Sequence, residues 1–184
     1  LTVVSGKSLA IIGPVCAGKS TLLRTLIGEA PVAAGQLDTQ NCERMAYVSQ
    51  DPFIRNASVR DNIVFCRAAD GDLAGAVETS AMDVDLANWP RGLDTEIGEQ
   101  GISLSGGQKM RLSLARAAYA DPQLVLLDDP LAAVDAHTES LLVERLLFGA
   151  WQERTRVVVT HRLDHLDRFD QVAFMEEGRI VSKG

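Results

Sequence analysis

The chain has 184 residues, of which 46% are hydrophobic and 23% charged, and its formal net charge is −7 at pH 7. This composition suits a globular domain with one buried core, and the acidic balance, with no run of Lys or Arg, argues against nucleic acid as a partner. No apolar run reaches the length of a membrane span, which is about 18 residues or more. The three cysteines lack C-x-x-C spacing, which favours a reducing compartment over disulfides or a zinc site.

The first predicted strand and helix flank a glycine-rich loop. Apolar residues 9–12 predict a buried strand, and residues 20–27 predict a helix that stops at Gly28. Between them lies Gly13-Pro14-Val15-Cys16-Ala17-Gly18-Lys19-Ser20, which fits G-x-x-x-x-G-K-[ST] at every fixed position. Such a loop turns backbone N–H groups and a helix N-terminus toward a phosphate, with Lys19 on the β- and γ-phosphates and the Ser20 hydroxyl on Mg²⁺. The alternative is a chance glycine turn, which the flanking strand and helix disfavour.

The remaining elements predict a mostly parallel sheet. Short apolar runs predict strands at residues 45–48, 124–127, 157–159 and 172–175. Residues 135–148 predict a helix with Asp135 as N-cap, and residues 53–118 show helical spacing of apolar positions. We therefore expect an α/β fold with helices on both faces of the sheet. Residues 1–52 and 119–184 would form the core and residues 53–118 an inserted helical lobe, in a domain truncated at both ends.

Polar residues follow three of the predicted strands. Gln50 follows the strand at 45–48, Asp128 and Asp129 follow the strand at 124–127, and His161 follows the strand at 157–159. Ligands of such sheets bind at the carboxyl ends of the strands. An acidic residue after four apolar ones, in a chain with a phosphate loop, predicts that Asp128 helps to hold Mg²⁺. An Asp-Asp-Pro turn with purely local hydrogen bonds is the alternative.

A second glycine-rich segment precedes the predicted helix at residues 109–118. It consists of Leu104-Ser105-Gly106-Gly107-Gln108. A serine and two glycines at a helix N-terminus expose N–H donors and the positive end of the helix dipole, which predicts another anion site. Taken alone, the same residues are equally typical of a flexible linker.

In this order, the motifs resemble those of ABC ATPases, and the resemblance covers essentially the whole chain. It implies a P-loop NTPase fold of the RecA-like type, with the signature motif at residues 104–108 carried by the helical lobe. It also implies that Gln50 contacts Mg²⁺ and water, and that His161 contacts the γ-phosphate. Residues 131–135 are similar to the loop that faces a partner domain, although a plain N-cap at Asp135 is an equal alternative.

Two further stretches are similar to ABC exporters. Residues 95–101 are similar to the exporter X-loop, although Gln100 replaces a basic residue, and Cys16 stands where a smaller residue is usual. Residues 127–135 are similar to the first nucleotide-binding domain of the multidrug-resistance-associated, or C, subfamily, in which Asp replaces the usual catalytic Glu. Asp129 occupies that position. Its shorter side chain would sit about 1–1.5 Å further from the attacking water, a misplacement that can cost about 10²-fold in rate.

The resemblance implies an ATP-binding, ATP-hydrolysing domain of an ABC exporter at the cytoplasmic face of a membrane, with weak hydrolysis at its own site. ATP and Mg²⁺ are the implied cofactors, and the implied partners are a second such domain, head to tail, and transmembrane domains. The alternatives are a regulatory ATP-sensing ABC module without turnover and a soluble, non-transport ABC ATPase.

The resemblance also assigns the site residues. The expected catalytic residues are Lys19, Gln50, Asp129 and His161, and the expected Mg²⁺ ligands are Ser20, Gln50 and Asp128. The residues expected at the domain's own nucleotide are Gly13, Pro14, Val15, Cys16, Ala17, Gly18, Lys19, Ser20, Thr21, Gln50, Asp128 and His161. The residues offered to a partner's nucleotide are Ser105, Gly106, Gly107 and Gln108.

Overall fold

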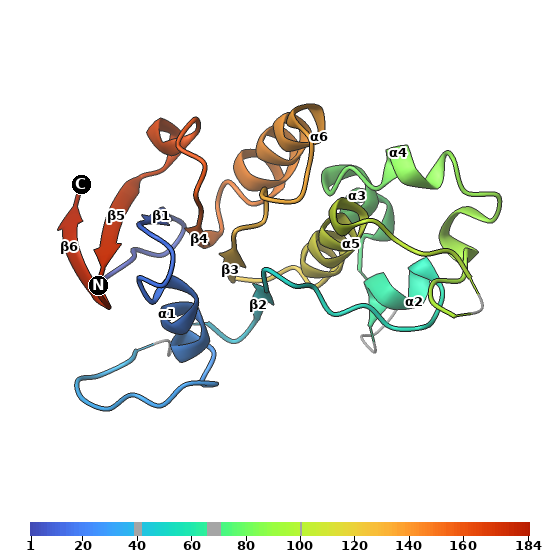
Figure 1. The fold of residues 1–184 in the computed structure, drawn as a ribbon. Helices are drawn as coiled ribbons and strands as arrows, with labels where there is room; N and C mark the ends of the chain where they lie inside the picture. The colour runs from blue at the N-terminus through green and yellow to red at the C-terminus, as the bar shows by residue number, and fades with distance from the viewer. Residues whose placement is uncertain (39–41, 66–70, 100) are drawn as a thin grey trace. The chain divides into compact units, whose positions relative to one another are not determined.

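A computed structural model describes residues 1–38, 42–65, 71–99 and 101–184 (Figure 1). The described residues form two compact units. The first consists of residues 1–50, 123–132 and 153–184, and the second of residues 51–122 and 133–152.

The first unit contains a six-stranded sheet with the order β2-β3-β4-β1-β5-β6 among the described residues. The strands are β1 (Ser8–Ile12), β2 (Met45–Val48), β3 (Leu124–Asp128), β4 (Thr155–Val159), β5 (Gln171–Glu176) and β6 (Arg179–Lys183). The first five strands pair in parallel, and only β6 is antiparallel to its neighbour β5. The prediction of a mostly parallel α/β fold is therefore confirmed.

The central strands β3 and β4 are buried and carry uninterrupted apolar runs at residues 124–127 and 157–159. All five residues of β3 and all five of β4 are buried, so these strands show continuous apolar runs rather than alternation. Helix α1 (Lys19–Leu26) packs its Leu23 into the core of this unit, beside Leu9, Leu126 and Val157. A short 3₁₀ helix, η3 (Leu166–Arg168), precedes β5.

The second unit is helical. Its elements are α2 (Val59–Val64), α3 (Leu73–Thr79), α4 (Asp83–Leu86), the 3₁₀ helix η1 (Gly92–Asp94), α5 (Gly106–Tyr119), α6 (Ala136–Leu141) and the π-helix η2 (Leu142–Ala150). Helix α5 lies against α2 and α3, and its Leu112 and Ala115 share a buried core with Val59, Ile63 and Val77. The N-cap of α6 is Asp135, whose carboxylate accepts the backbone N–H groups of residues 137 and 138.

The packing places residues 133–152 with the second unit, whereas the sequence interpretation assigned them to the core. The helix expected over residues 135–148 is present as α6 followed by η2. The assignment of residues 53–118 to an inserted helical lobe that carries the signature motif stays a prediction. Within the described ranges, no helix is both long enough and apolar enough to cross a bilayer.

One hydrogen-bonded cluster joins the starts of β1 and β5. The carboxylate of Asp170 accepts hydrogen bonds from the Lys7 ammonium at 2.9 Å and from the Ser8 backbone N–H and hydroxyl at 2.8 Å each. The Lys7 hydrogen bond, followed by those from Ser8, holds the pKa of Asp170 well below its usual range.

We expect Asp170→Asn to lower the free energy of unfolding at pH 7 by about 1 kcal/mol, because the amide cannot replace all three of these bonds. A carboxyl whose pKa is depressed in the folded state stabilises above its unfolded pKa, about 3.9, and this contribution fades as pH falls further. The difference between wild type and variant in urea unfolding should therefore shrink below about pH 4. Asp167→Asn, at an exposed carboxyl of η3, is the control; a pH-independent difference for Asp170→Asn would contradict this account.

Candidate functional site

The loop between β1 and α1 turns sharply because its backbone is left-handed at several positions. The φ angles are +149° at Gly13, +64° at Cys16 and +94° at Gly18. A Cβ atom on Gly13 would clash with the backbone carbonyl of Met175 on β5, so only glycine fits there. The loop therefore depends on its glycines both for conformation and for its close approach to the sheet.

Lys19, the first residue of α1, is held by the loop that it follows. Its side chain is buried, with 6% of the residue exposed, and its Nζ donates to the carbonyl oxygens of Gly13 at 2.8 Å and Pro14 at 2.7 Å. An ammonium group has three N–H donors. Two of them fix the side chain to the loop, and the third can donate to an anion.

A cavity of about 280 Å³ lies over this loop, entirely within the first unit. It is lined by Val15, Cys16, Ala17, Gly18, Lys19, Ser20, Thr21, Gln50, Asp128, Asp129, Val159 and His161. Pockets that enclose a whole small ligand measure about 300–1,000 Å³. This cavity therefore has the size for the phosphate end of a nucleotide.

The two carboxylates occupy different positions at the end of β3. Asp128 is the last residue of the strand, and Asp129 leaves it with a φ of +52°, a conformation that Asp tolerates better than most residues. The Asp129 N–H donates to the Val159 carbonyl at 2.9 Å, and its Oδ1 accepts the His161 backbone N–H at 3.4 Å. Both carboxylates are buried.

Burial raises the pKa of Tyr47 on β2 above its ordinary value, and the negative charge of Asp128 adds to that shift.

Three oxygen-bearing side chains of this cavity fit a magnesium ion. They are the Ser20 hydroxyl, the Gln50 amide and the Asp128 carboxylate. Mg²⁺ takes oxygen ligands and is usually bound by one or two protein groups together with substrate phosphates and water. The donor set at this edge of the sheet is therefore of the right chemistry for Mg²⁺ beside a triphosphate.

The glycine-rich segment of the second unit forms the start of α5. Ser105 is the N-cap, its Oγ accepts the Gln108 backbone N–H at 3.2 Å, and the Gln108 Oε1 accepts the Ser105 N–H at 2.9 Å. This reciprocal capping box leaves the N–H groups of Gly106 and Gly107 without a partner among the described hydrogen bonds. The segment is therefore an ordered helix start and not a flexible linker.

The structure thus brings most of the predicted residues of the own site together. Gly13 and Pro14 do not line the cavity and act instead through their carbonyls on Lys19. Val159 lines the cavity and was missed by the sequence interpretation, although its place at the end of a buried strand was a usable signal. Ser105, Gly106, Gly107 and Gln108 belong to the second unit. Gln100 lies outside the described residues.

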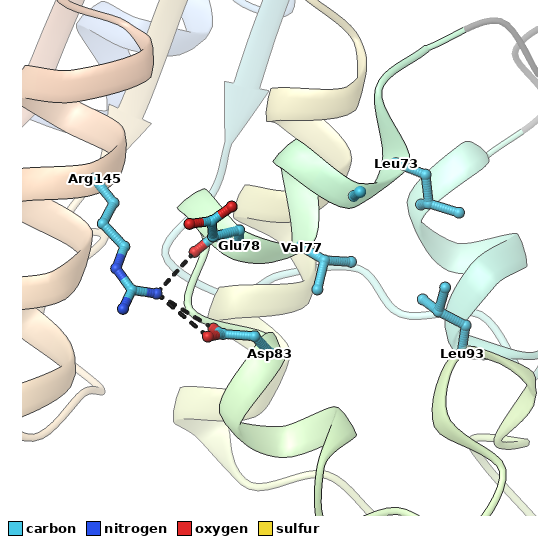
Figure 2. A pocket seen from close by; sticks show the side chains of 7 residues that line it. Leu73, Val77, Glu78, Asp83, Leu93 and Arg145 are labelled. Atoms are coloured by element: carbon cyan, nitrogen blue, oxygen red, sulfur yellow. Dashed lines mark hydrogen bonds and ion pairs between the residues drawn. The ribbon is translucent and has the colours of Figure 1, made fainter.

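A larger pocket, of about 610 Å³, lies within the second unit (Figure 2). Its lining is partly aliphatic, and Arg145 on one side donates to the Asp83 carboxylate and to the Glu78 carbonyl, each at 3.3 Å. It contains none of the motif residues. Of these two cavities in the described part of the chain, the smaller one combines a phosphate loop with carboxylates.

A glycine-rich phosphate loop at the end of a central parallel strand, with an acidic residue ending a second parallel strand on the far side of β4, defines a P-loop nucleotide-binding domain. The family model described as "ABC transporter" matches residues 1–132. The chain belongs to the ABC transporter family.

Its relatives include proteins named for multidrug resistance and for the C subfamily. The chain is 43% identical over 185 residues to "Multidrug resistance protein" of Leishmania tarentolae and 41% identical over 186 residues to "ATP-binding cassette sub-family C member 10" of Homo sapiens, in each case over 100% of this chain. It is 42% identical over 180 residues, 97% of this chain, to "ABC transporter C family member 7" of Arabidopsis thaliana. The chain spans 12% of the length of each of these relatives.

We expect Cys16 to react with a maleimide faster than Cys42, because Cys16 is exposed in the phosphate loop and Cys42 is half-buried. Mg·ATP at about ten times its dissociation constant should slow labelling of Cys16 by about tenfold, because only free protein presents the loop. Mass spectrometry after brief treatment measures both rates. Labelling of Cys42 should not respond to ATP, and equal labelling of Cys16 with and without ATP would place the nucleotide elsewhere.

Proposed function

We propose that this chain binds Mg·ATP and is the ATP-hydrolysing domain of an ABC exporter at the cytoplasmic face of a membrane. The observation that carries the proposal is the single cavity that joins the phosphate loop to Gln50, the two carboxylates and His161. The names of the relatives support the exporter assignment.

The reaction is in-line attack of water on the γ-phosphorus, with ADP as leaving group. Lys19 donates its remaining N–H to phosphate oxygens, and the exposed His161 contacts the γ-phosphate from the end of β4. Ser20, Gln50 and Asp128 would hold Mg²⁺, which neutralises phosphate charge when bound. Catalysis in this arrangement comes from positioning and charge stabilisation.

Asp129 orients the attacking water only weakly. Its carboxylate is one methylene shorter than that of Glu, and the His161 backbone N–H holds one oxygen at 3.4 Å, beside the end of β4. We therefore propose that the own site turns ATP over slowly, as in a first nucleotide-binding domain of the C type.

A complete site requires a second domain in this proposal. Ser105, Gly106 and Gly107 present donors suited to a phosphate and would serve nucleotide held by a second such domain, head to tail. ATP binding would drive this dimerisation, and transmembrane domains of the same protein would receive the resulting motion. The greater length of the relatives leaves room for both partners.

A regulatory ATP-sensing domain without turnover is the second candidate, and Asp129 is the observation that favours it. Asp129→Glu should raise single-turnover hydrolysis at this site by about tenfold, because the longer carboxylate reaches the water. The assay uses the full polypeptide with the partner's own site disabled. The backbone at residue 129 is left-handed, which disfavours the longer side chain, so Asp129→Glu should lower the free energy of unfolding by about 1 kcal/mol. Urea unfolding measures this loss separately.

Asp129→Asn is the matched control, since it keeps size and backbone but removes the base. It should abolish the residual hydrolysis that Asp129→Glu increases. If both variants turn over ATP no faster than wild type, and wild type itself shows none, the sensing function replaces the hydrolytic one.

The assignment of the two glycine-rich motifs to different nucleotides is tested by photolabelling with azido-ATP. Lys19→Ala should lower labelling of this domain by about ten- to a hundredfold, because a charge-assisted hydrogen bond is lost. Ser105→Arg should leave that labelling intact and slow turnover of the assembly. Equal loss of labelling from both changes would contradict the two-domain site.

A further inference from the structure

A buried carboxylate lies beneath the start of α5. Asp85 on the short helix α4 is 7% exposed, and Arg111 on α5 contacts it with the edge of its guanidinium that carries Nε and Nη2. The Arg111 Nε donates to Oδ2 at 2.8 Å and its Nη2 donates to Oδ1 at 2.9 Å. A charge buried in this way is costly unless it is paired, and a bidentate pair fixes the geometry of both groups.

The same carboxylate also fixes the side chain of Gln108. Its Oδ1 accepts the Gln108 Nε2–H at 3.0 Å, while the Gln108 Oε1 accepts the Ser105 backbone N–H at 2.9 Å. Only one orientation of the amide satisfies both partners, because a carboxylate can only accept and an N–H can only donate. Asp85 therefore selects the orientation of Gln108 that completes the cap of α5.

This chain of contacts leaves the outer donors of the helix start free. The Ser105 Oγ accepts the Gln108 backbone N–H at 3.2 Å, so its own proton remains available, as do the Gly106 and Gly107 N–H groups among the described hydrogen bonds. The inner side is closed. A Cβ on Gly107 would lie 2.9 Å from the Ala133 carbonyl oxygen and 3.5 Å from the Arg111 Nη1.

We propose that Asp85 is a positioning residue for this segment. It acts through Gln108 and Arg111 to hold the Ser105 hydroxyl and the glycine N–H groups in the array that receives the terminal phosphate of a nucleotide bound to a second domain. The inference rests on the proposed function, which supplies the nucleotide that this array would bind.

Asp83 supplies a matched control on the same helix. Its carboxylate pairs with Arg145 at 3.3 Å and its side chain is 43% exposed. Within the described ranges, no hydrogen bond or ion pair joins it to the start of α5. Asp83→Asn and Asp85→Asn therefore remove the same charge from the same helix, and only the second change reaches Gln108.

The test measures ATP turnover at saturating ATP, together with azido-ATP labelling of this domain, in the full polypeptide. Asp85→Asn should lower kcat by about tenfold or more, because misplacement of a contact group by about 1 Å is costly in rate. Labelling at the domain's own phosphate loop should stay within about twofold of wild type, as expected for a group outside that loop. Asp83→Asn should change neither quantity.

A polarity exchange separates positioning from folding. In Asp85→Asn/Gln108→Glu, the new amide can donate to the new carboxylate, which can still accept the Ser105 N–H. The amide oxygen can still accept the Arg111 Nε–H, and the Nη2 contact at the Oδ1 position is lost. The double variant should recover more than half of the kcat lost in Asp85→Asn, whereas Gln108→Glu alone sets two carboxylates together and should be impaired. Thermal unfolding of each variant shows whether a loss of kcat is only a loss of folded protein.

Two results would overturn the inference. In the first, the Asp85→Asn variant has the same kcat as the Asp83→Asn variant. In the second, the kcat lost in Asp85→Asn parallels the loss of folded protein, and the double variant recovers none of that kcat. The proposed function fails differently, through a Ser105→Arg variant that turns over ATP like wild type. That outcome would remove the nucleotide role of the whole segment, including Asp85.

Discussion

The site depends on the parallel register of the sheet around β1. Strand β1 pairs with β4 on one side and β5 on the other, with Ile11 opposite Val159 and Ile12 opposite Phe174. Strand β4 in turn sets Val159 opposite Asp128 of β3. Because these strands run in the same direction, the phosphate loop, the carboxylates and the residues after β4 emerge at one edge. A shift of register would move Lys19 and Asp128, which line the same cavity, relative to each other.

Two of the non-glycine residues with a left-handed backbone lie at this edge of the sheet. Cys16 and Asp129 both adopt left-handed conformations without being glycine, and the left-handed region costs such residues about 1–2 kcal/mol. Two hydrogen bonds offset part of this cost at Asp129. Its N–H donates to the Val159 carbonyl, and its carboxylate accepts the His161 N–H. Strained residues that persist because their surroundings hold them are typical of ligand sites. Here the strain turns the chain sharply enough for both segments to line one cavity.

Most of the sheet could be predicted from the sequence, because buried parallel strands leave continuous apolar runs. Strand β2 has the bounds expected from Met45–Val48, and α1 begins and ends one residue earlier than expected. The π-helix at Leu142–Ala150 could not be predicted, since its hydrogen-bond register leaves no apolar signature of its own. Gly149 permits that register: a Cβ there would lie 2.6 Å from the Glu144 carbonyl oxygen.

The phosphate loop was predictable because its chemistry lies in one contiguous stretch, whereas Asp85 had no local signal. Asp83 and Asp85 stand in the same short stretch, and only the fold decides that the first pairs with Arg145 near the surface and the second is buried under Gln108. Val159 differs from Asp85 in this respect, because its place at the end of the buried strand β4 was a usable signal. Motif residues can be found by spacing, while the residues that hold a motif in place are found only by contact.

The two glycine-rich segments solve the problem of binding an anion in different ways. The phosphate loop has its own cation, because Lys19 is fixed by two carbonyls and keeps one donor for phosphate. At the start of α5 the guanidinium of Arg111 is neutralised by Asp85, and the outward donors of Ser105, Gly106 and Gly107 are uncharged. A hydrogen bond from an uncharged donor to a phosphate free in solution is little more favourable than the hydrogen bonds to water that it replaces. It contributes more binding free energy when the phosphate is already held and partly dehydrated. In the proposed dimer the α5 segment would therefore bind only nucleotide that a phosphate loop already holds, and association of two domains would report ATP occupancy.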